Sequence, residues 1–333
     1  MAKSTKALPG KRSARKTPDS TTEGKEQKGR RQGLIIASLI LAVILVVVGV
    51  GYYLIYVKPF QTTVIVVGED TINIGYFIKR TRMDIDASGD PNVMLERLTQ
   101  EILIKQGAPR YGIEATEEDI TDALKEVARG ESETISDSEF KEWYRQQLNE
   151  TELTDSEYRD IMHMLVLAQR LQEYLAERVP TVAEQVHLHI IVLESYEDAL
   201  EVKEKLDAGA DFADLARELS IDEQTGKGGG DIGWIPVDIL EGPFAWAALN
   251  LDIGEASEPL MTSETAFSIS MVSEKAVARE LDDNSLEIMK AKALQDWLTE
   301  EMGHTKIEFH GFKNGFDSET YAWIKYQLAK RED

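Results

Sequence analysis

Residues 226–234 read GKGGGDIGW and include three glycines with the spacing G-x-G-x-x-G of dinucleotide-binding loops. Such a loop binds a pyrophosphate only where a strand enters the glycines and a helix leaves them, because the helix amides hold the phosphates. Here a predicted helix, residues 211–220, comes before the glycines. The segment after them contains Pro236 and Pro243, which argue against a helix start there. We therefore interpret the glycines as a tight turn into a short strand at residues 231–235.

The composition excludes several classes of site. The chain has 333 residues and no cysteine, so disulfides, thiolate metal sites and a cysteine nucleophile are excluded. Residues 1–32 carry 10 Lys or Arg and 3 Asp or Glu, whereas the remainder carries 27 and 57. This strongly acidic remainder would repel phosphates, so we expect no nucleic-acid partner.

Residues 33–57 contain no charged side chain and predict one transmembrane helix. At about 1.5 Å per residue, this segment spans about 37 Å, more than a hydrocarbon core of about 30 Å. The basic residues 1–32 then form a cytoplasmic tail, which places the C-terminal domains outside a cell membrane that the chain crosses once. A cleaved signal peptide is the alternative, but its apolar region is shorter, at about 7–15 residues.

Residues 58–180 are mostly helical in pattern, after a short hairpin near residues 64–74. Three helix starts carry capping boxes, at Thr116, Ser136 and Thr154. A further amphipathic helix at residues 285–302 has no apolar partner nearby in sequence. We expect it to pack against helices that precede Pro180.

Between these helical segments the pattern changes to a mixture of strands and helices. A strand-like run is followed by two helices, the glycine turn, a short helix and two extended stretches, near residues 256–259 and 266–272. The pattern predicts a compact α+β unit that closes near Lys275.

Several segments of this unit resemble the parvulin-type peptidyl-prolyl isomerases: HIIV, AGADFADLARELSID, GGGDIGW and GPFAWAALNLDIGEASEPL. The resemblance covers residues 186–274. The anchor and the bracketing helices also resemble the extracytoplasmic foldases of the SurA and PrsA type. It implies an α+β fold in which a parvulin-like domain, a small antiparallel sheet with surrounding helices, is inserted in an all-α chaperone-like domain. The implied division is a basic cytoplasmic tail (1–32), a transmembrane helix (33–57), the N-terminal part of a helical chaperone-like domain (58–180), a parvulin-like isomerase domain (181–277) and the C-terminal helical part of the chaperone-like domain (278–333).

The resemblance also implies site residues. The positions of the family's proline pocket are Ile232, Leu240 and Phe244, and its polar catalytic positions are His189, Asp222 and Ser268. From the residues alone, Ile232 and Phe244 are equally interpreted as core. Asp222 is equally interpreted as the cap of a turn, because it follows the end of a helix.

The implied function is isomerisation of X-Pro bonds in exported proteins by a membrane-anchored foldase, with unfolded or newly exported proline-containing polypeptides as partners. Relatives carry a second histidine where this chain has Ser268, and the two imidazoles hydrogen-bond across neighbouring strands. Serine cannot do this in the same way. The alternative is therefore a parvulin-fold chaperone with weak or no isomerase activity. No cofactor is expected.

His187 lies two residues before His189 and so shares its strand face. One hypothesis is that His187, with the hydroxyl of Ser268, partly replaces the missing imidazole in orienting His189, directly or through a water. The alternative is an incidental side chain turned to solvent or backbone. The two histidines could also bind a metal with a carboxylate such as Asp222, but two histidines alone are a weak signal, and we expect no metal.

Overall fold

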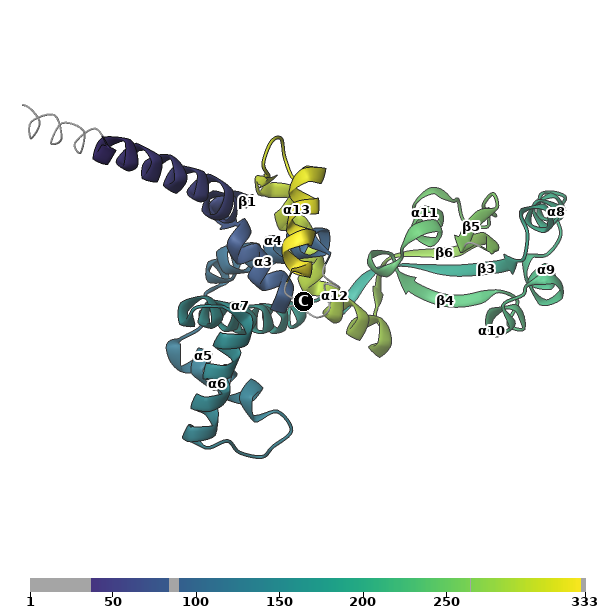
Figure 1. Ribbon diagram of the computed structural model, residues 1–333. Helices are drawn as coiled ribbons and strands as arrows, with labels where there is room; N and C mark the ends of the chain where they lie inside the picture. Colours follow the sequence, from purple (N-terminus) through teal and green to yellow (C-terminus); the bar gives the residue numbers. More distant parts are fainter. Residues whose placement is uncertain (1–36, 84–89, 264, 331–333) are drawn as a thin grey trace, which may run out of the picture.

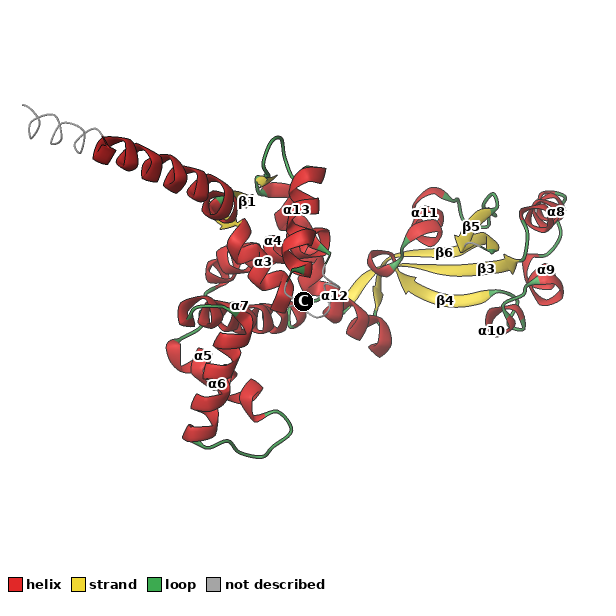
Figure 2. Ribbon diagram, in the orientation of Figure 1, coloured by secondary structure: helices red, strands yellow, loops and turns green. Residues whose placement is uncertain are grey.

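The computed structural model describes residues 37–83, 90–263 and 265–330. It has an α+β fold, as the sequence predicts, and its described residues are mostly helical with two antiparallel sheets. The structure has a helical part and a sheet part, which lie side by side. The long central strands of the sheet part, β3 (Val182–Leu193) and β6 (Ala266–Glu280), extend toward the helical part (Figures 1 and 2).

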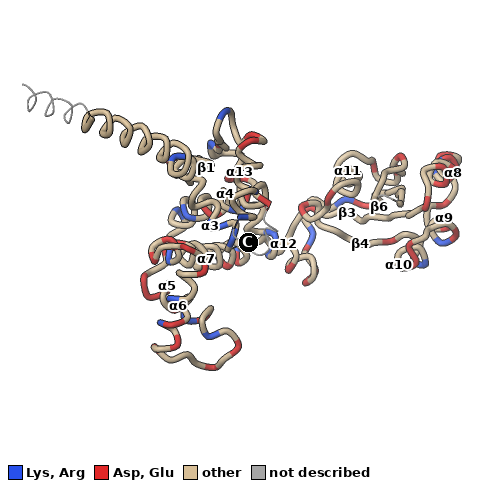
Figure 3. The backbone as a smooth tube through the Cα atoms, in the orientation of Figure 1, with Lys and Arg blue, Asp and Glu red and all other residues tan. Residues whose placement is uncertain are grey.

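One apolar helix, Ala37–Gln61, projects from the helical part. Its sequence has no acidic or basic side chain before Lys58, as Figure 3 shows. It includes a π-helical turn, Tyr53–Val57, and ends in α2 (Lys58–Gln61), four residues beyond the predicted end at residue 57. It is long and apolar enough to cross a membrane. The predicted basic tail, 1–32, lies outside the described residues.

Three helices of the helical part begin where the predicted capping boxes lie. The side chains of Thr116, Ser136 and Thr154 each accept a hydrogen bond from the backbone amide three residues later, and the acidic residue there bonds back. These three helices are α5 (Glu117–Arg129), α6 (Asp137–Thr151) and α7 (Asp155–Ala176), and they follow α3 (Ile74–Met83), α4 (Pro91–Gly107) and a 3₁₀ turn η2 (Ala108–Tyr111).

The helical part is not all-α, which corrects the prediction. The expected hairpin forms from β1 (Thr63–Val67) and β2 (Asp70–Asn73), and β7 (Ile307–Phe309) pairs with β1 to give the order β2-β1-β7. Strand β7 was not predicted, because three residues are too few to show a strand period. Helix α13 (Ser318–Ala329) follows it.

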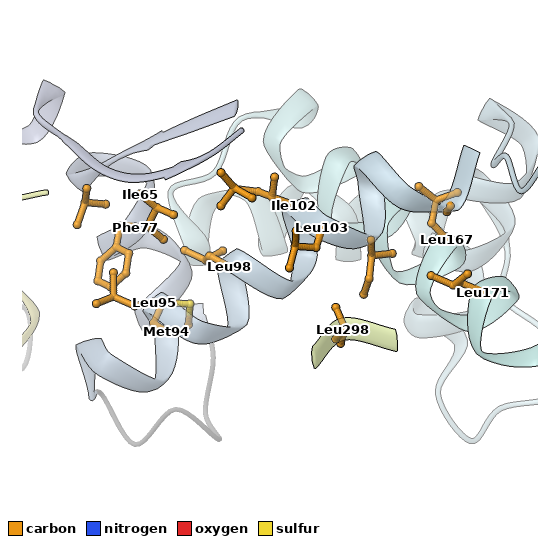
Figure 4. Packing of buried hydrophobic residues seen from close by; sticks show 14 of the residues in the cluster. Ile65, Phe77, Met94, Leu95, Leu98, Ile102, Leu103, Leu167, Leu171 and Leu298 are labelled. Atoms are coloured by element: carbon orange, nitrogen blue, oxygen red, sulfur yellow. The ribbon is translucent and has the colours of Figure 1, made fainter. Parts of the chain in front are cut away.

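Helix α12 (Asp283–His304) closes the core of the helical part. Its Trp297 and Leu298 are 6% and 4% exposed and belong to the same buried cluster as Leu103 of α4 and Leu171 of α7. Figure 4 shows Leu298 with these two leucines. Burying a leucine side chain contributes about 1.5–3 kcal/mol. The prediction that this helix packs against helices before Pro180 is confirmed.

The sheet part has four antiparallel strands in the order β4-β3-β6-β5, with β4 (Asp231–Pro236) and β5 (Leu260–Ser263) at the edges. Strand β6 continues to Glu280, beyond the predicted close near Lys275, and pairs there with the start of β3. The helices around this sheet are α8 (Tyr196–Asp207), α9 (Phe212–Leu219), α10 (Glu223–Gly226), η3 (Val237–Ile239) and α11 (Gly242–Asn250).

The two faces of this sheet carry separate apolar clusters, because side chains alternate along β3. Ile191 and Leu193 pack with residues of α8 and α9. Val186 and Leu188 face the other way and pack with Ala248 of α11. A residue of β3 therefore packs either with α8 and α9 or with α11, depending on the sheet face from which its side chain projects.

Candidate functional site

The glycine turn joins α10 to β4, so a strand and not a helix leaves the glycines. The absence of a helix N-terminus there confirms that the spacing is not a nucleotide-binding loop. Gly230 has φ +79°, and a Cβ on it would lie 2.4 Å from the carbonyl oxygen of Ile190. The same glycine accepts a hydrogen bond from the Ile190 amide at 2.8 Å. The turn is thus held directly against the central strand.

Ile232, Leu240 and Phe244 come together on the α11 face of the sheet. All three are half-buried and pack on one cluster with the fully buried Val186 and Leu188. Ile232 lies one residue into β4, and Phe244 lies in the first turn of α11. The three side chains therefore form an apolar surface, and each of them remains partly exposed to solvent.

Asp222 caps helix α10, as its alternative interpretation predicts. Its carboxylate accepts hydrogen bonds from the Thr225 hydroxyl at 2.7 Å and the Gln224 amide at 3.1 Å. These bonds, the Thr225 hydroxyl first, lower the pKa of Asp222 below its ordinary value. The preceding residue, Ile221, donates its amide to the carbonyl of Val192, so Asp222 lies beside that point of β3.

Ser268 pairs directly with Val192 across β3 and β6, and its side chain is fully buried. Paired residues share a face, and Val192 lies three residues after His189, so Ser268 and His189 project from opposite faces. The Ser268 hydroxyl has no hydrogen-bond partner within the described part of the chain. The hypothesis that Ser268 orients His189 is therefore wrong.

The hydroxyl that orients His189 belongs to Ser273. The distance from His189 Nε2 to Ser273 Oγ is 2.9 Å. Ser273 occupies a β-bulge in β6, where the register against β3 shifts between His187 and Leu188. Burial lowers the pKa of His189, the His187 imidazole adds to this, and the Asp231 carboxylate opposes it. The sequence shows no signal for Ser273, because a bulge depends on the pairing of two distant strands.

His187 is packed against neighbouring side chains and is not turned to solvent. Its ring centre lies 5.0 Å from that of His189 and stacks on Trp234 at 5.4 Å. Its Nε2 lies 2.8 Å from Asp231 Oδ1, and the guanidinium of Arg279 lies over the other ring, Trp234. The hydrogen-bond partner of His187 is thus Asp231, a residue that the sequence did not single out.

The arrangement has an accessible apolar surface on one sheet face and a polar histidine cluster on the other. The family model described as "Rotamase: PPIC-type PPIASE domain" matches residues 193–274 of this chain. This chain contains a PpiC-type parvulin domain. The matched residues include Asp222, Ile232, Leu240, Phe244 and Ser268 and begin after the histidines of β3.

The chain is related to PrsA foldases and SurA chaperones. It is 28% identical over 174 residues to Foldase protein PrsA of Oceanobacillus iheyensis, covering 50% of this chain and 55% of that protein. It is 28% identical over 216 residues to Chaperone SurA of Alcanivorax borkumensis, covering 56% and 48%. The chain thus matches about half the length of these relatives.

Among solved structures, the peptidylprolyl isomerase PrsA of Bacillus anthracis is 18% identical to this chain. The alignment covers 72% of this chain and 97% of that chain, with a TM-score of 0.34.

Proposed function

We propose that this foldase catalyses cis-trans isomerisation of X-Pro bonds in exported proteins. The observation that supports this most is the half-buried apolar set of Ile232, Leu240 and Phe244. X-Pro isomerisation takes tens to hundreds of seconds uncatalysed and needs no covalent step. The planar amide is more dipolar than the twisted one, so an apolar pocket around the proline favours the twisted state.

We propose that the polar groups of this reaction are Asp222 and Ser268, on either side of Val192. The Asp222 carboxylate is held ionised by its cap bonds, and the buried Ser268 hydroxyl has an unused donor within the described residues. His189 projects from the other face. In this proposal it is a positioning residue, which acts by holding β3 and not by touching the substrate.

The test compares full-length protein in detergent with buffer alone, by the rate of cis-to-trans change in a short X-Pro peptide. We expect Phe244→Ala to lower the added rate about tenfold or more, because burial of such a side chain contributes about 1.5–3 kcal/mol. Leu249→Ala is the matched control, since Leu249 lies on the same helix and is 69% exposed. A wild-type rate equal to that of buffer would refute the enzyme proposal.

The alternative is a chaperone with weak or no isomerase activity. It is supported by Ser268 in place of the second family histidine and by a groove of about 640 Å³ in the helical part. The groove is lined mainly by apolar side chains of α4, α12, β7 and the segment before α13: Leu95, Met302, Ile307, Phe309 and Phe316. Such a surface suits extended apolar segments of an unfolded client.

Suppression of client aggregation tests this alternative. We expect Phe309→Ser, in the groove, to weaken suppression while leaving the peptide isomerisation rate unchanged. Val277→Ser is the control, because Val277 is 86% exposed and lies outside the groove lining. Equal suppression by both variants would exclude this groove as the client site.

We further propose that helix Ala37–Gln61 is an uncleaved anchor, with residues 1–32 cytoplasmic and the domains outside. Its length, its apolar composition and the basic residues before it support this orientation. Residues 58–180 and 278–333 then form the chaperone-like domain, and 181–277 the isomerase domain. Mass spectrometry of the membrane-extracted protein tests the anchor, because a mature chain that lacks the helix would show a cleaved signal sequence instead.

A further inference from the structure

Three metal-ligand side chains, His187, His189 and Asp231, converge on the sheet face opposite the apolar pocket. One ring nitrogen of each histidine and one carboxylate oxygen all lie within 4.8 Å of one another. The histidines alternate on β3, and Asp231, which begins β4, pairs with His189. Strand pairing thus adds to the two histidines a third ligand, Asp231, which lies 42 residues after His189 in sequence.

These side chains suit a zinc-like ion. Bonds of about 2.0–2.2 Å to imidazole nitrogen and carboxylate oxygen place two ligands of a tetrahedral ion about 3.4 Å apart. The largest separation in the cluster therefore needs to shorten by only about 1.4 Å, relative to 4.8 Å. Two histidines and one carboxylate form an open site, in which water completes the coordination.

The surrounding groups prepare both rings as ligands. The Ser273 hydroxyl donates to the carbonyl of His187 at 3.4 Å, so its oxygen accepts from Nε2–H of His189. This tautomer leaves Nδ1 of His189 with a free lone pair. The buried Nδ1 of His187 has no hydrogen-bond partner in the described residues, and Glu274 Oε1 lies 3.9 Å from it. An ion bound to Nε2 of His187 would move the ring proton to Nδ1. The Nδ1–H group could then donate a hydrogen bond to the Glu274 carboxylate.

We propose that His187, His189 and Asp231 bind one divalent transition-metal ion of the zinc type. The ion joins the central strand β3 to the edge strand β4 and replaces the His187–Asp231 hydrogen bond. Asp231 immediately precedes Ile232, so the ion also holds the start of β4 behind the apolar pocket. This site shares only the positioning residue His189 with the isomerase proposal, and none of its ligands belongs to the pocket.

The test is calorimetric titration of the full chain, in detergent and without a histidine tag, with ZnCl₂. We expect one saturable equivalent, and at least tenfold weaker binding in His187→Ala, His189→Ala and Asp231→Asn. Asp231→Asn preserves side-chain shape and the acceptor for the Gly233 amide, so weaker binding there does not reflect unfolding. A Co²⁺ titration gives a second readout, the visible absorption of a tetrahedral site.

Two controls separate this site from others. His310→Ala removes a different histidine beside an acidic residue, Glu308, and Asp222→Asn removes the carboxylate that caps α10. Both should leave the affinity for Zn²⁺ unchanged. The proposal is overturned if the wild-type chain shows no saturable binding, if Asp231→Asn binds as tightly as wild type, or if His310→Ala abolishes binding.

Discussion

Substitution of Gly230 by alanine should destabilise the sheet part far more than the same change at Gly233. Both glycines have positive φ, +79° and +92°, so both alanines incur a backbone cost of roughly 1–2 kcal/mol. Only at Gly230 would the new Cβ meet backbone, 2.4 Å from the Ile190 carbonyl oxygen, whereas nothing lies within 4 Å at Gly233. Gly233→Ala is therefore a control that matches backbone conformation without the steric contact.

The size of the difference follows from two terms. Relieving the overlap requires a backbone shift, with an overpacking cost of about 1–3 kcal/mol. That shift also strains the 2.8 Å hydrogen bond from the Ile190 amide to Gly230, worth about 0.5–1.5 kcal/mol. We expect Gly230→Ala to cost about 2–4 kcal/mol more than Gly233→Ala. For a domain of 60–100 residues this corresponds to a melting temperature lower by roughly 8 °C or more.

Differential scanning calorimetry of the two full-length variants measures this difference. Hydrogen exchange adds a local readout, because Gly230→Ala should increase exchange at the Ile190 amide and along β4. If the two variants melt at the same temperature and exchange alike, the close approach of the turn to β3 does not control stability, and the steric reasoning is refuted.

Two further predictions concern the helical part. Leu298→Ala should lower the free energy of unfolding by about 2–5 kcal/mol, whereas Ile288→Ala on the same helix, where Ile288 is 39% exposed, should change it by about 0.5 kcal/mol or less in urea unfolding. Arg170 and the Thr116 cap lower the pKa of Asp119, so its stabilisation is complete above about pH 4 and lost as the pH falls toward the lower folded-state pKa. Asp119→Asn should remove this part of the acid dependence of the melting temperature, but Asp122→Asn, exposed on the same helix, should not.

The sequence alone determined the features that depend on neighbouring residues. The capping boxes at Thr116, Ser136 and Thr154, the early hairpin and the strand after the glycines all form where predicted, because each depends on side chains within a few positions. The apolar side of the helix near residues 285–302 also predicted a distant partner. The resemblance to parvulins located the segment that carries the apolar set.

Only the tertiary structure decided which polar groups meet. Strand β7 is too short to be recognised by periodicity and forms only because β1 offers an edge. Ser268 and Ser273 lie on the same strand, yet the register of β6 against β3 directs Ser273 to His189 and Ser268 to the opposite face. Asp231 reaches His187 through the pairing of β3 with β4. Register and bulges arise from contacts between residues far apart in the chain, so local pattern could not assign these partners.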